Sequence, residues 1–468
     1  MLLIFLLIYI ASFILTCREV WRGNNSGILI FMIFGLSMYV TAMSVAFTYG
    51  LKDLIPLLQS FKEGVILFVL ILNIAALRQR PRFHIIDYVI FAFLLYVTLY
   101  AILPIGDQGL VNRLMALKSM AFYIVVYFTG RLIDPKTVYV NKYFTYIILL
   151  AIATAAVLLI EVATKTPLQF VSGYFDYSYY FYNLEAEGPF GLKATFNSDT
   201  GFTRYASFFT SPLEHAGATV IALAVVFGLY TRDDNKFNIN SIGIIALGAI
   251  LLSIFYSLSR APMASCCIMI YVYALLTKRK LILNTIHTVF AIAAIYVIYL
   301  FVQFEQTNNS IMAVVLNTID FSDPSSVGHL AQWVEGITSI AIHPFGLGMG
   351  TSGRVAASTS ENVGGENQYI IIAVQAGLIA AFLYLLMFIM FVKIGLKWLP
   401  LLKGKERKVC MAVLFIKVGF FLSTLTSEVE SSTYLSYLNW FLSGLLISII
   451  MQPKATQTLP VYDHRENN

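Results

Sequence analysis

Residues 143–160 read YFTYIILLAIATAAVLLI, a run without one charged side chain. A helix of about 20 such residues crosses the ~30 Å hydrocarbon core of a bilayer. Similar runs occupy residues 28–47 and 242–256. Of the 468 residues, 59% are hydrophobic and 12% are charged, about half the charged fraction of a soluble domain. This composition excludes a soluble globular protein and predicts an all-α polytopic membrane protein.

The apolar runs predict about thirteen transmembrane helices. The first run lacks a basic start and a small-residue cleavage pattern, so we interpret it as a span and not as a removable signal peptide. Without it the expected number is about twelve. The expected spans are residues 2–16, 27–47, 60–77, 85–103, 114–130, 143–162, 212–230, 239–257, 261–277, 284–303, 367–392, 409–427 and 434–451. Because no repeat or low-complexity tract divides the chain, we expect a single transmembrane domain over residues 1–468.

The basic residues predict the orientation, because lysine and arginine gather in cytoplasmic loops. When Arg78, Arg80 and Arg82 are placed in the cytoplasm, about two thirds of the 31 basic residues fall on that side, and most of the 25 acidic residues do not. We therefore expect an external N-terminus and a cytoplasmic C-terminus.

Two external segments, residues 163–211 and residues 304–366, are long, and long loops in compact proteins are often functional. The first is rich in tyrosine and phenylalanine around Tyr180, which fits either an interfacial aromatic belt or a platform for stacking sugars.

The second external segment predicts an amphipathic helix at about residues 324–342. Asp323 is a suitable N-cap and Pro324 a suitable first helical residue. Apolar residues then recur at spacings of three and four, which indicates a helix lying along the outer interface. They are Val327, Leu330, Val334, Ile337 and Ala341.

Two external arginines are candidate anion-binding residues, because a guanidinium offers a planar fork of donors that matches phosphate oxygens. Arg260 ends the sequence Ser257-Leu258-Ser259-Arg260 at the outer end of a span, and its alternative role is a snorkelling side chain. Arg204 lies shortly before another span and could equally be a solvated loop charge.

Two residues of the second external segment are candidate bases. Glu366 precedes a span, where a carboxylate either stabilises the helix start or accepts a proton from a hydroxyl. His343 precedes the glycine run Gly346-Leu347-Gly348-Met349-Gly350 and fits either a base or a simple helix end. The glycine run alone is weak evidence for phosphate binding, because no strand precedes it.

Other ionisable residues leave a transport pathway open as an alternative. Lys417 lies within an expected span, with Glu428 and Glu430 at its outer end. The sequence shows no metal triad and no nucleotide-binding loop. The cysteines lie in expected spans or at their cytoplasmic ends, so they predict neither an external disulfide framework nor a metal site. They are Cys17, Cys266, Cys267 and Cys410.

The order of several short motifs over roughly residues 140–450 resembles the O-antigen ligase and polymerase superfamily of bacterial surface-polysaccharide assembly. The motifs are Arg204-x-x-Ser207-x-Phe209-x-Ser211-Pro212, Ser259-Arg260-Ala261, Pro344-Phe345-Gly346-Leu347-Gly348-Met349-Gly350, Glu366-Asn367-Gln368-Tyr369 and Gln375-Ala376-Gly377-Leu378-Ile379-Ala380.

The resemblance implies a membrane glycosyltransferase of the C-type architecture in the bacterial inner membrane, acting on its external face without a metal or other cofactor. The substrate would be an undecaprenyl-diphosphate-linked glycan, with Arg204 and Arg260 holding the diphosphate. Asn367, Tyr369 and Tyr180 are candidate substrate contacts. A flippase and chain-length regulators would be partner proteins, and we expect no nucleic-acid partner.

One departure from the family pattern favours a polymerase of O-antigen, capsule or exopolysaccharide units. Ligases of this superfamily usually have histidine before the asparagine, where this chain has Glu366. The Glu-Asn pair resembles the polymerase branch, with Glu366 or His343 as the base. A ligase that transfers glycan to lipid A core or to protein remains an alternative, as does a transporter or flippase.

Overall fold

The computed structural model describes residues 2–77, 81–185, 188–192, 194–197, 202–303, 324–359 and 362–452. Within these ranges the chain is helical, and extended pairing is limited to two isolated bridges. The helices are α1 (Leu3–Trp21), α2 (Ile28–Ile30), α3 (Tyr39–Thr48), α4 (Ile55–Ala75), α5 (Ile85–Ile102), α6 (Leu110–Arg131), α7 (Val140–Thr164), α8 (Leu168–Val171), α9 (Tyr174–Tyr182), α10 (Pro212–Tyr230), α11 (Ser241–Ser257), α12 (Arg260–Leu276), α13 (Lys280–Gln303), α15 (Pro324–Ile342), α16 (Gly353–Thr359), α17 (Gln368–Trp398), α18 (Gly404–Thr426) and α19 (Thr433–Met451).

The predicted all-α polytopic membrane fold is confirmed. In the described part of the chain, nine helices are long and apolar enough to cross a membrane, and a tenth span is formed if the pair Asn25–Gly35 and Tyr39–Thr48, bent by 62°, counts as one. Three shorter apolar helices, Ser241–Ser257, Arg260–Leu276 and Lys280–Tyr296, occupy further expected spans. Each span expected from the sequence overlaps one of these elements.

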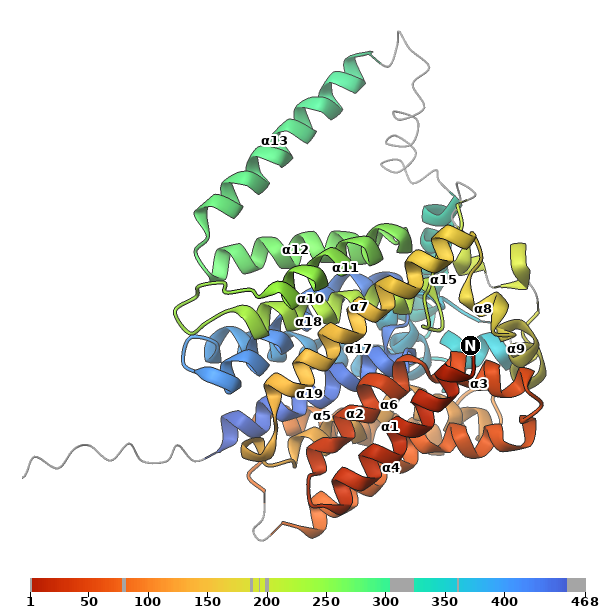
Figure 1. Ribbon diagram of the computed structural model, residues 1–468. Coiled ribbons are helices and arrows are strands. Elements are labelled where there is room, and N and C mark those ends of the chain that lie inside the picture. The colour runs from red at the N-terminus through yellow and green to blue at the C-terminus, as the bar shows by residue number, and fades with distance from the viewer. Residues whose placement is uncertain are drawn as a thin grey trace, which may run out of the picture.

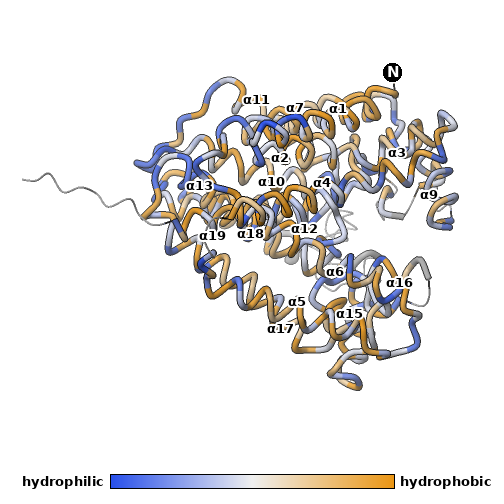
Figure 2. The backbone as a smooth tube through the Cα atoms, turned by 90° about the horizontal axis from the view of Figure 1, so that it is seen from below, coloured by the Kyte–Doolittle hydropathy of each residue, from blue (hydrophilic) through white to orange (hydrophobic). Residues whose placement is uncertain are grey.

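The long helices form one bundle with α8, α9 and α15 at the end where α1 begins, which we call the α9 end (Figure 1). Helix α19 finishes at the opposite end, and α13 extends away from the bundle with α12 as its neighbour (Figure 1). Hydrophobic residues run along the helices, and hydrophilic residues gather toward the two ends (Figure 2).

Small residues allow the central helices to approach closely, as is common between membrane helices. A Cβ atom on Gly130 of α6 would lie 2.2 Å from the Phe441 carbonyl oxygen, and one on Gly444 of α19 would lie 2.1 Å from the Tyr127 carbonyl oxygen. Larger side chains at either glycine would therefore separate α6 from α19.

A buried ion pair joins α5 to α6 near the end of the bundle opposite α9. The Asp87 carboxylate lies 3.3 Å from Arg131 Nε and accepts a hydrogen bond from the Tyr127 hydroxyl. Arg131 also donates to the Arg82 carbonyl oxygen at 2.6 Å. Both charged side chains are almost fully buried, and pairing offsets the cost of their burial.

The expected helix at residues 324–342 is present as α15, although its proposed N-cap Asp323 lies outside the described residues. Its apolar stripe is exposed, with Val327 48%, Leu330 45%, Val334 56% and Ile337 57% accessible. The opposite face of α15 packs on α17. This arrangement leaves the stripe available to lipid, as expected for an interfacial helix.

Candidate functional site

Arg204 lies in a loop that buried polar groups fix to the end of α7. The Glu161 carboxylate accepts hydrogen bonds from the Ser207 N–H at 2.8 Å and the Leu168 N–H at 2.7 Å. The Gln169 amide donates to the carbonyl oxygens of Ser207 and Phe209. The Arg204 N–H itself donates to the carbonyl oxygen of Phe196 at 2.8 Å. The backbone that carries the guanidinium is therefore held from both sides.

The start of α10 completes this support. The Ser211 hydroxyl caps the helix by accepting the Glu214 N–H at 3.2 Å, and the Glu214 carboxylate accepts the N–H of Thr210, the residue before the cap, at 3.1 Å. The buried His215 ring donates from Nδ1 to the Tyr205 carbonyl oxygen, 3.2 Å away. His215 thus positions the residue next to Arg204.

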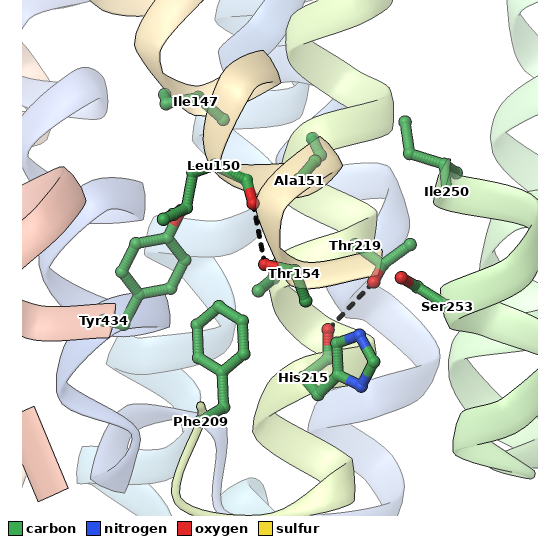
Figure 3. A pocket seen from close by; sticks show the side chains of 12 residues that line it. Ile147, Leu150, Ala151, Thr154, Phe209, His215, Thr219, Ile250, Ser253 and Tyr434 are labelled. Carbon is green, nitrogen blue, oxygen red and sulfur yellow. Dashed lines mark hydrogen bonds between the residues drawn. The ribbon is translucent and has the colours of Figure 1, made fainter. Parts of the chain in front are cut away.

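A cavity of about 10 Å³, room for about one water, lies beside His215 between α7, α10 and α11 (Figure 3). The Thr219 and Thr154 hydroxyls on its wall donate to backbone carbonyls of their own helices (Figure 3). The ring of Phe209 stacks on His215 with centroids 5.9 Å apart. The cavity is too small for a phosphate and belongs to the packing beneath the loop.

Arg260 is the first residue of α12 and follows a tight turn from α11 in which Leu258 has a φ of 45°. A cation at this place opposes the helix dipole, whose positive end lies at the N-terminus. The Ser259 side chain makes no capping hydrogen bond to the first helical N–H groups. Guanidinium and helix start together form an environment that favours an anion.

The two arginines lie at the same end of a packed group of helices. Helices α10, α11 and α12 contact one another. Arg204 lies in the loop before α10 and Arg260 is the first residue of α12, and both helices run away from the α9 end (Figure 1). Tyr205 is within electrostatic range of Tyr256, which is four residues before Arg260. The fold therefore brings the two guanidinium-bearing segments close together.

Glu366 contacts a residue that the sequence did not single out. Its carboxylate Oε2 pairs with His329 Nδ1 of α15, and both side chains are about 40% exposed, at 41% and 35%. The loop before α17 packs closely on α15 because the two residues in contact, Gly336 and Gly364, are both glycines. A Cβ atom added to Gly364 would lie only 2.8 Å from the Cα atom of Gly336. The pair with His329 places Glu366 beside the first half of α15.

His343 does not join Glu366. It is exposed after the last turn of α15, fourteen residues beyond His329, which is roughly 21 Å along a helix. The structure therefore separates the two expected candidate bases.

The glycine run beside His343 packs against a break in α17. Gly377 has a φ of 81° inside that helix, a left-handed conformation that interrupts the helical hydrogen bonds. The carbonyl groups just before the break can therefore accept hydrogen bonds from the glycine run. Leu347 N–H donates to Val374 and Gly348 N–H to Gln375, at 2.7 and 3.1 Å. The run contributes close backbone packing, and its N–H groups at Leu347, Gly348 and Gly350 are used within the protein.

The three candidate substrate contacts have different environments. The Asn367 side chain caps α17, accepting from the N–H groups of Tyr369 and Ile370. Tyr369 is half-buried, and its ring packs on Tyr384 with centroids 5.6 Å apart. Tyr180 is 59% exposed on α9, where its ring contacts Phe47. Of the three, only Tyr180 presents most of its side chain to a ligand.

Lys417 lies buried inside the bundle, 4.7 Å from the Phe391 ring centroid and 4.4 Å from that of Trp440. Glu430 accepts hydrogen bonds from Tyr384, Ser436 and Trp440. The cavity between them measures about 10 Å³. This is a packed polar core that ties α17, α18 and α19 together.

Four further charged or titratable residues near the α9 end were missed from the sequence. His329 lies on the polar face of α15, seven residues before Gly336, so the helical period could have indicated it. The other three are Lys62 on α4, Lys118 on α6 and Arg354 on α16. They are far apart in the sequence, and only the packing of these helices brings them near one another. Among the described residues, no group of three or more His, Cys, Asp or Glu side chains could hold a metal ion.

Comparison with known families supports the resemblance seen in the motifs. Residues 245–385 match the family described as O-antigen ligase, a segment that includes Arg260, α15 and Glu366. A comparison with curated proteins finds no match.

Proposed function

Residues 245–385 match the O-antigen ligase family, and from this match we propose that the chain polymerises lipid-linked glycan repeat units. The donor would be a growing chain on undecaprenyl diphosphate, and the acceptor a sugar hydroxyl of an incoming lipid-linked unit. The hydroxyl oxygen attacks the anomeric carbon of the donor and forms a glycosidic bond. The bond from that carbon to the phosphate oxygen breaks, undecaprenyl diphosphate leaves, and a base takes the hydroxyl proton.

The observation that carries this proposal is that Arg204, on a loop held to the end of α7, and Arg260, the first residue of α12, both lie at the α9 end of the packed helices α10, α11 and α12. A departing diphosphate gains negative charge, and donors that are already in position stabilise such charge most strongly. Each of the two guanidinium groups can also donate a pair of hydrogen bonds to phosphate oxygens. We assign both arginines to the donor diphosphate.

Glu366 is the proposed base, and His329 is the residue that orients it. A carboxylate and an imidazole in contact can pass a proton between them while the acceptor hydroxyl is deprotonated. His343 lies beyond the end of α15, roughly 21 Å from His329 along the helix axis, which supports Glu366 and not His343 as the proposed base.

The position of Glu366 favours polymerase over ligase, because the ligase pattern has histidine there. We place the active site on the external face of the bacterial inner membrane, at the α9 end, with the C-terminus in the cytoplasm. A flippase that supplies the lipid-linked unit and a chain-length regulator are the expected partner proteins. The product would be O-antigen, capsule or exopolysaccharide.

Replacing Arg204 or Arg260 with alanine should abolish long glycan chains, because the leaving diphosphate loses a charged donor. A fall of about a hundredfold or more in polymer per protein is expected for each. Glycan ladders on gels, normalised to the amount of protein in the membrane, measure the effect. Arg232→Ala, an exposed arginine at the other end of α10, is the matched control and should leave ladders intact. Unchanged ladders in both Arg204→Ala and Arg260→Ala would refute the proposal.

The alternatives predict other products. Loss of a ligase leaves polymer on the undecaprenyl carrier, whereas loss of a polymerase leaves single units, and a gel separates the two. A transporter would move substrate into vesicles without forming a bond. Lys417, the residue that suggested transport, lies between two aromatic rings beside a cavity with room for about one water, so it does not favour that role.

A further inference from the structure

The segment between α15 and α17, which leads to Glu366, is rich in glycine. Glycine loses more conformational freedom on folding than any other residue. Contacts from other helices must therefore hold this segment if Glu366 is to keep one position. We call residues 350–354, at the start of α16, the α16 turn. The glycines of the segment that have positive φ are Gly346, Gly348, Gly350, Gly353 and Gly364.

The α16 turn pairs with the loop that carries Glu366. The Ser352 hydroxyl donates to the Val363 carbonyl oxygen at 2.5 Å. The Gly353 N–H donates to the side-chain oxygen of Asn362 at 2.9 Å. Both contacts reach the loop three or four residues before Glu366. Any group that fixes the α16 turn therefore also fixes the approach to Glu366.

The first anchor of the α16 turn is Gln375 of α17. Its Oε1 atom accepts the Gly350 N–H at 2.8 Å, and its Nε2 atom donates to the Ser352 carbonyl oxygen at 3.0 Å. The Gln375 side chain is buried. One amide thus holds two points of the turn against α17.

The second anchor is Glu428, in the segment between α18 and α19. Its Oε2 atom accepts the Arg354 N–H at 2.8 Å. A Cβ atom on Gly353 would lie 3.2 Å from the same oxygen, so the absence of a side chain there lets the carboxylate approach the backbone. The Arg354 guanidinium donates to the Ser431 carbonyl oxygen at 3.3 Å. Glu428 and Ser431 thus tie the turn to one short segment.

That short segment is itself fixed to the bundle. Residues Val429–Ser431 form a single 3-10 turn, and the Glu430 N–H donates to Gln368 Oε1 at 3.1 Å. The Glu430 carboxylate is held by the buried donors of α17 and α19 described above. Glu428 therefore extends from a rigid part of the molecule toward a glycine-rich one.

The cavity beside Glu428 does not offer the carboxylate to a sugar. It measures about 10 Å³, room for about one water, and Ser119 of α6 and Gln368 of α17 line it together with Glu428. A sugar ring is many times larger. The contact that connects Glu428 to the proposed site is the one with the α16 turn.

We propose that Glu428 is a positioning residue for glycosyl transfer, which acts through the α16 turn to hold the loop that sets Glu366 against His329. This inference rests on the proposed function and on Glu366 as its base. It gives a role to a carboxylate that, in the sequence, suggested a transport pathway. Because Gln375 still holds the turn when Glu428 is replaced, the loop should shift and not detach.

Kinetics of the purified enzyme separate positioning from binding. Glu428→Ala should lower kcat about tenfold or more, because a base displaced by even about 1 Å loses much of its effect. KM for the lipid-linked donor should stay within about twofold, because the proposed diphosphate contacts remain. Gly353→Ala should reproduce this loss, since its Cβ atom displaces the Glu428 carboxylate.

The conservative variant Glu428→Gln distinguishes a positioning role from a chemical one. Its amide oxygen can still accept the Arg354 N–H, so kcat should stay within roughly threefold of the unmodified enzyme. Glu335→Ala removes an exposed carboxylate from α15 and is the matched control, with unchanged kcat expected. A Glu428→Gln variant as slow as Glu428→Ala would overturn the proposal, because the carboxylate would then act in the chemistry itself.

Crosslinking tests the position of the loop without relying on turnover. With the native cysteines replaced by alanine, His329→Cys and Glu366→Cys place two thiols at the contact between α15 and the loop. A short bifunctional thiosulfonate should join them, and mass spectrometry of the linked peptides gives the rate. Adding Glu428→Ala should lower this rate roughly fivefold, as expected for the loss of one hydrogen bond. Adding Glu428→Gln or Glu335→Ala should leave it unchanged.

Equal crosslinking rates with and without Glu428→Ala would refute the positioning role. The proposed base is tested separately, since a fully active Glu366→Gln variant would remove Glu366 from the chemistry. The crosslinking rates would still decide whether Glu428 holds the loop.

Discussion

At the scale of single residues, the contact between Glu366 and His329 makes the candidate base a unit of two side chains. Glu366→Gln keeps the size of the side chain but removes its ability to accept a proton, so polymer formation should fall by about a hundredfold or more. His329→Ala should have a smaller effect, roughly tenfold, because it removes the orienting partner and leaves the carboxylate.

Initial rates with purified protein and lipid-linked units would measure both effects, and His343→Ala is the control at the far end of α15. Equal rates for Glu366→Gln and the unmodified protein would exclude Glu366 as the base. A loss confined to His343→Ala would restore that residue as the candidate.

The sequence indicated Arg204, Arg260 and Glu366 because charges beside apolar spans are costly and so draw attention. It did not indicate His329, which lies in an amphipathic helix outside the expected spans and contacts Glu366 only because the loop before α17 packs on that helix. The role of Asn367 also depended on geometry, since its amide caps a helix and is not directed outward.

At the scale of elements, the backbone of the glycine run packs directly against the break in α17. A Cβ on Gly377 would lie 2.7 Å from the Phe345 carbonyl carbon, and one on Gly348 would lie 2.2 Å from the Ile105 carbonyl oxygen. Both glycines have positive φ. Alanine at either position should therefore cost about 1–3 kcal/mol of stability and lower the thermal midpoint by several degrees.

Gly328→Ala is the matched control, because nothing lies within 4 Å of the added Cβ and alanine favours a helix. Thermal unfolding of the purified protein, followed by tryptophan fluorescence, compares the three. Gly377→Ala and Gly348→Ala variants that unfold at the same temperature as Gly328→Ala would show that this backbone contact tolerates side chains.

Apolar runs were sufficient to predict where the spans lie, but not where they break or begin. Helix α4 starts at Ile55 and α6 at Leu110, several residues before the expected spans, because the added residues include polar side chains that interrupt the apolar run. These are Gln59 in α4, and Asn112 and Arg113 in α6. The break at Gly377 lies inside a continuous apolar run, and only the docked glycine loop explains it.

At the scale of the whole molecule, the distribution of positive charge predicts which end faces the cytoplasm. With the native cysteines replaced by alanine, Asp176→Cys on α9 should react with a membrane-impermeant maleimide in intact spheroplasts. Lys403→Cys, between α17 and α18, should react only after the membrane is opened, because basic residues favour the cytoplasmic side. Both positions are exposed. The reverse pattern of labelling would invert the orientation and remove the external active site.

The ion pair between Asp87 and Arg131 also bears on how the chain is made. The two residues are separated by 44 positions, so a ribosome delivers Asp87 to the translocon well before its partner. During that interval a carboxylate belonging to α5 has no arginine to neutralise it, and a lone charge in the hydrocarbon is costly. Entry of α5 into the bilayer is thereby coupled to the arrival of α6, and the two helices are best released together as a hairpin.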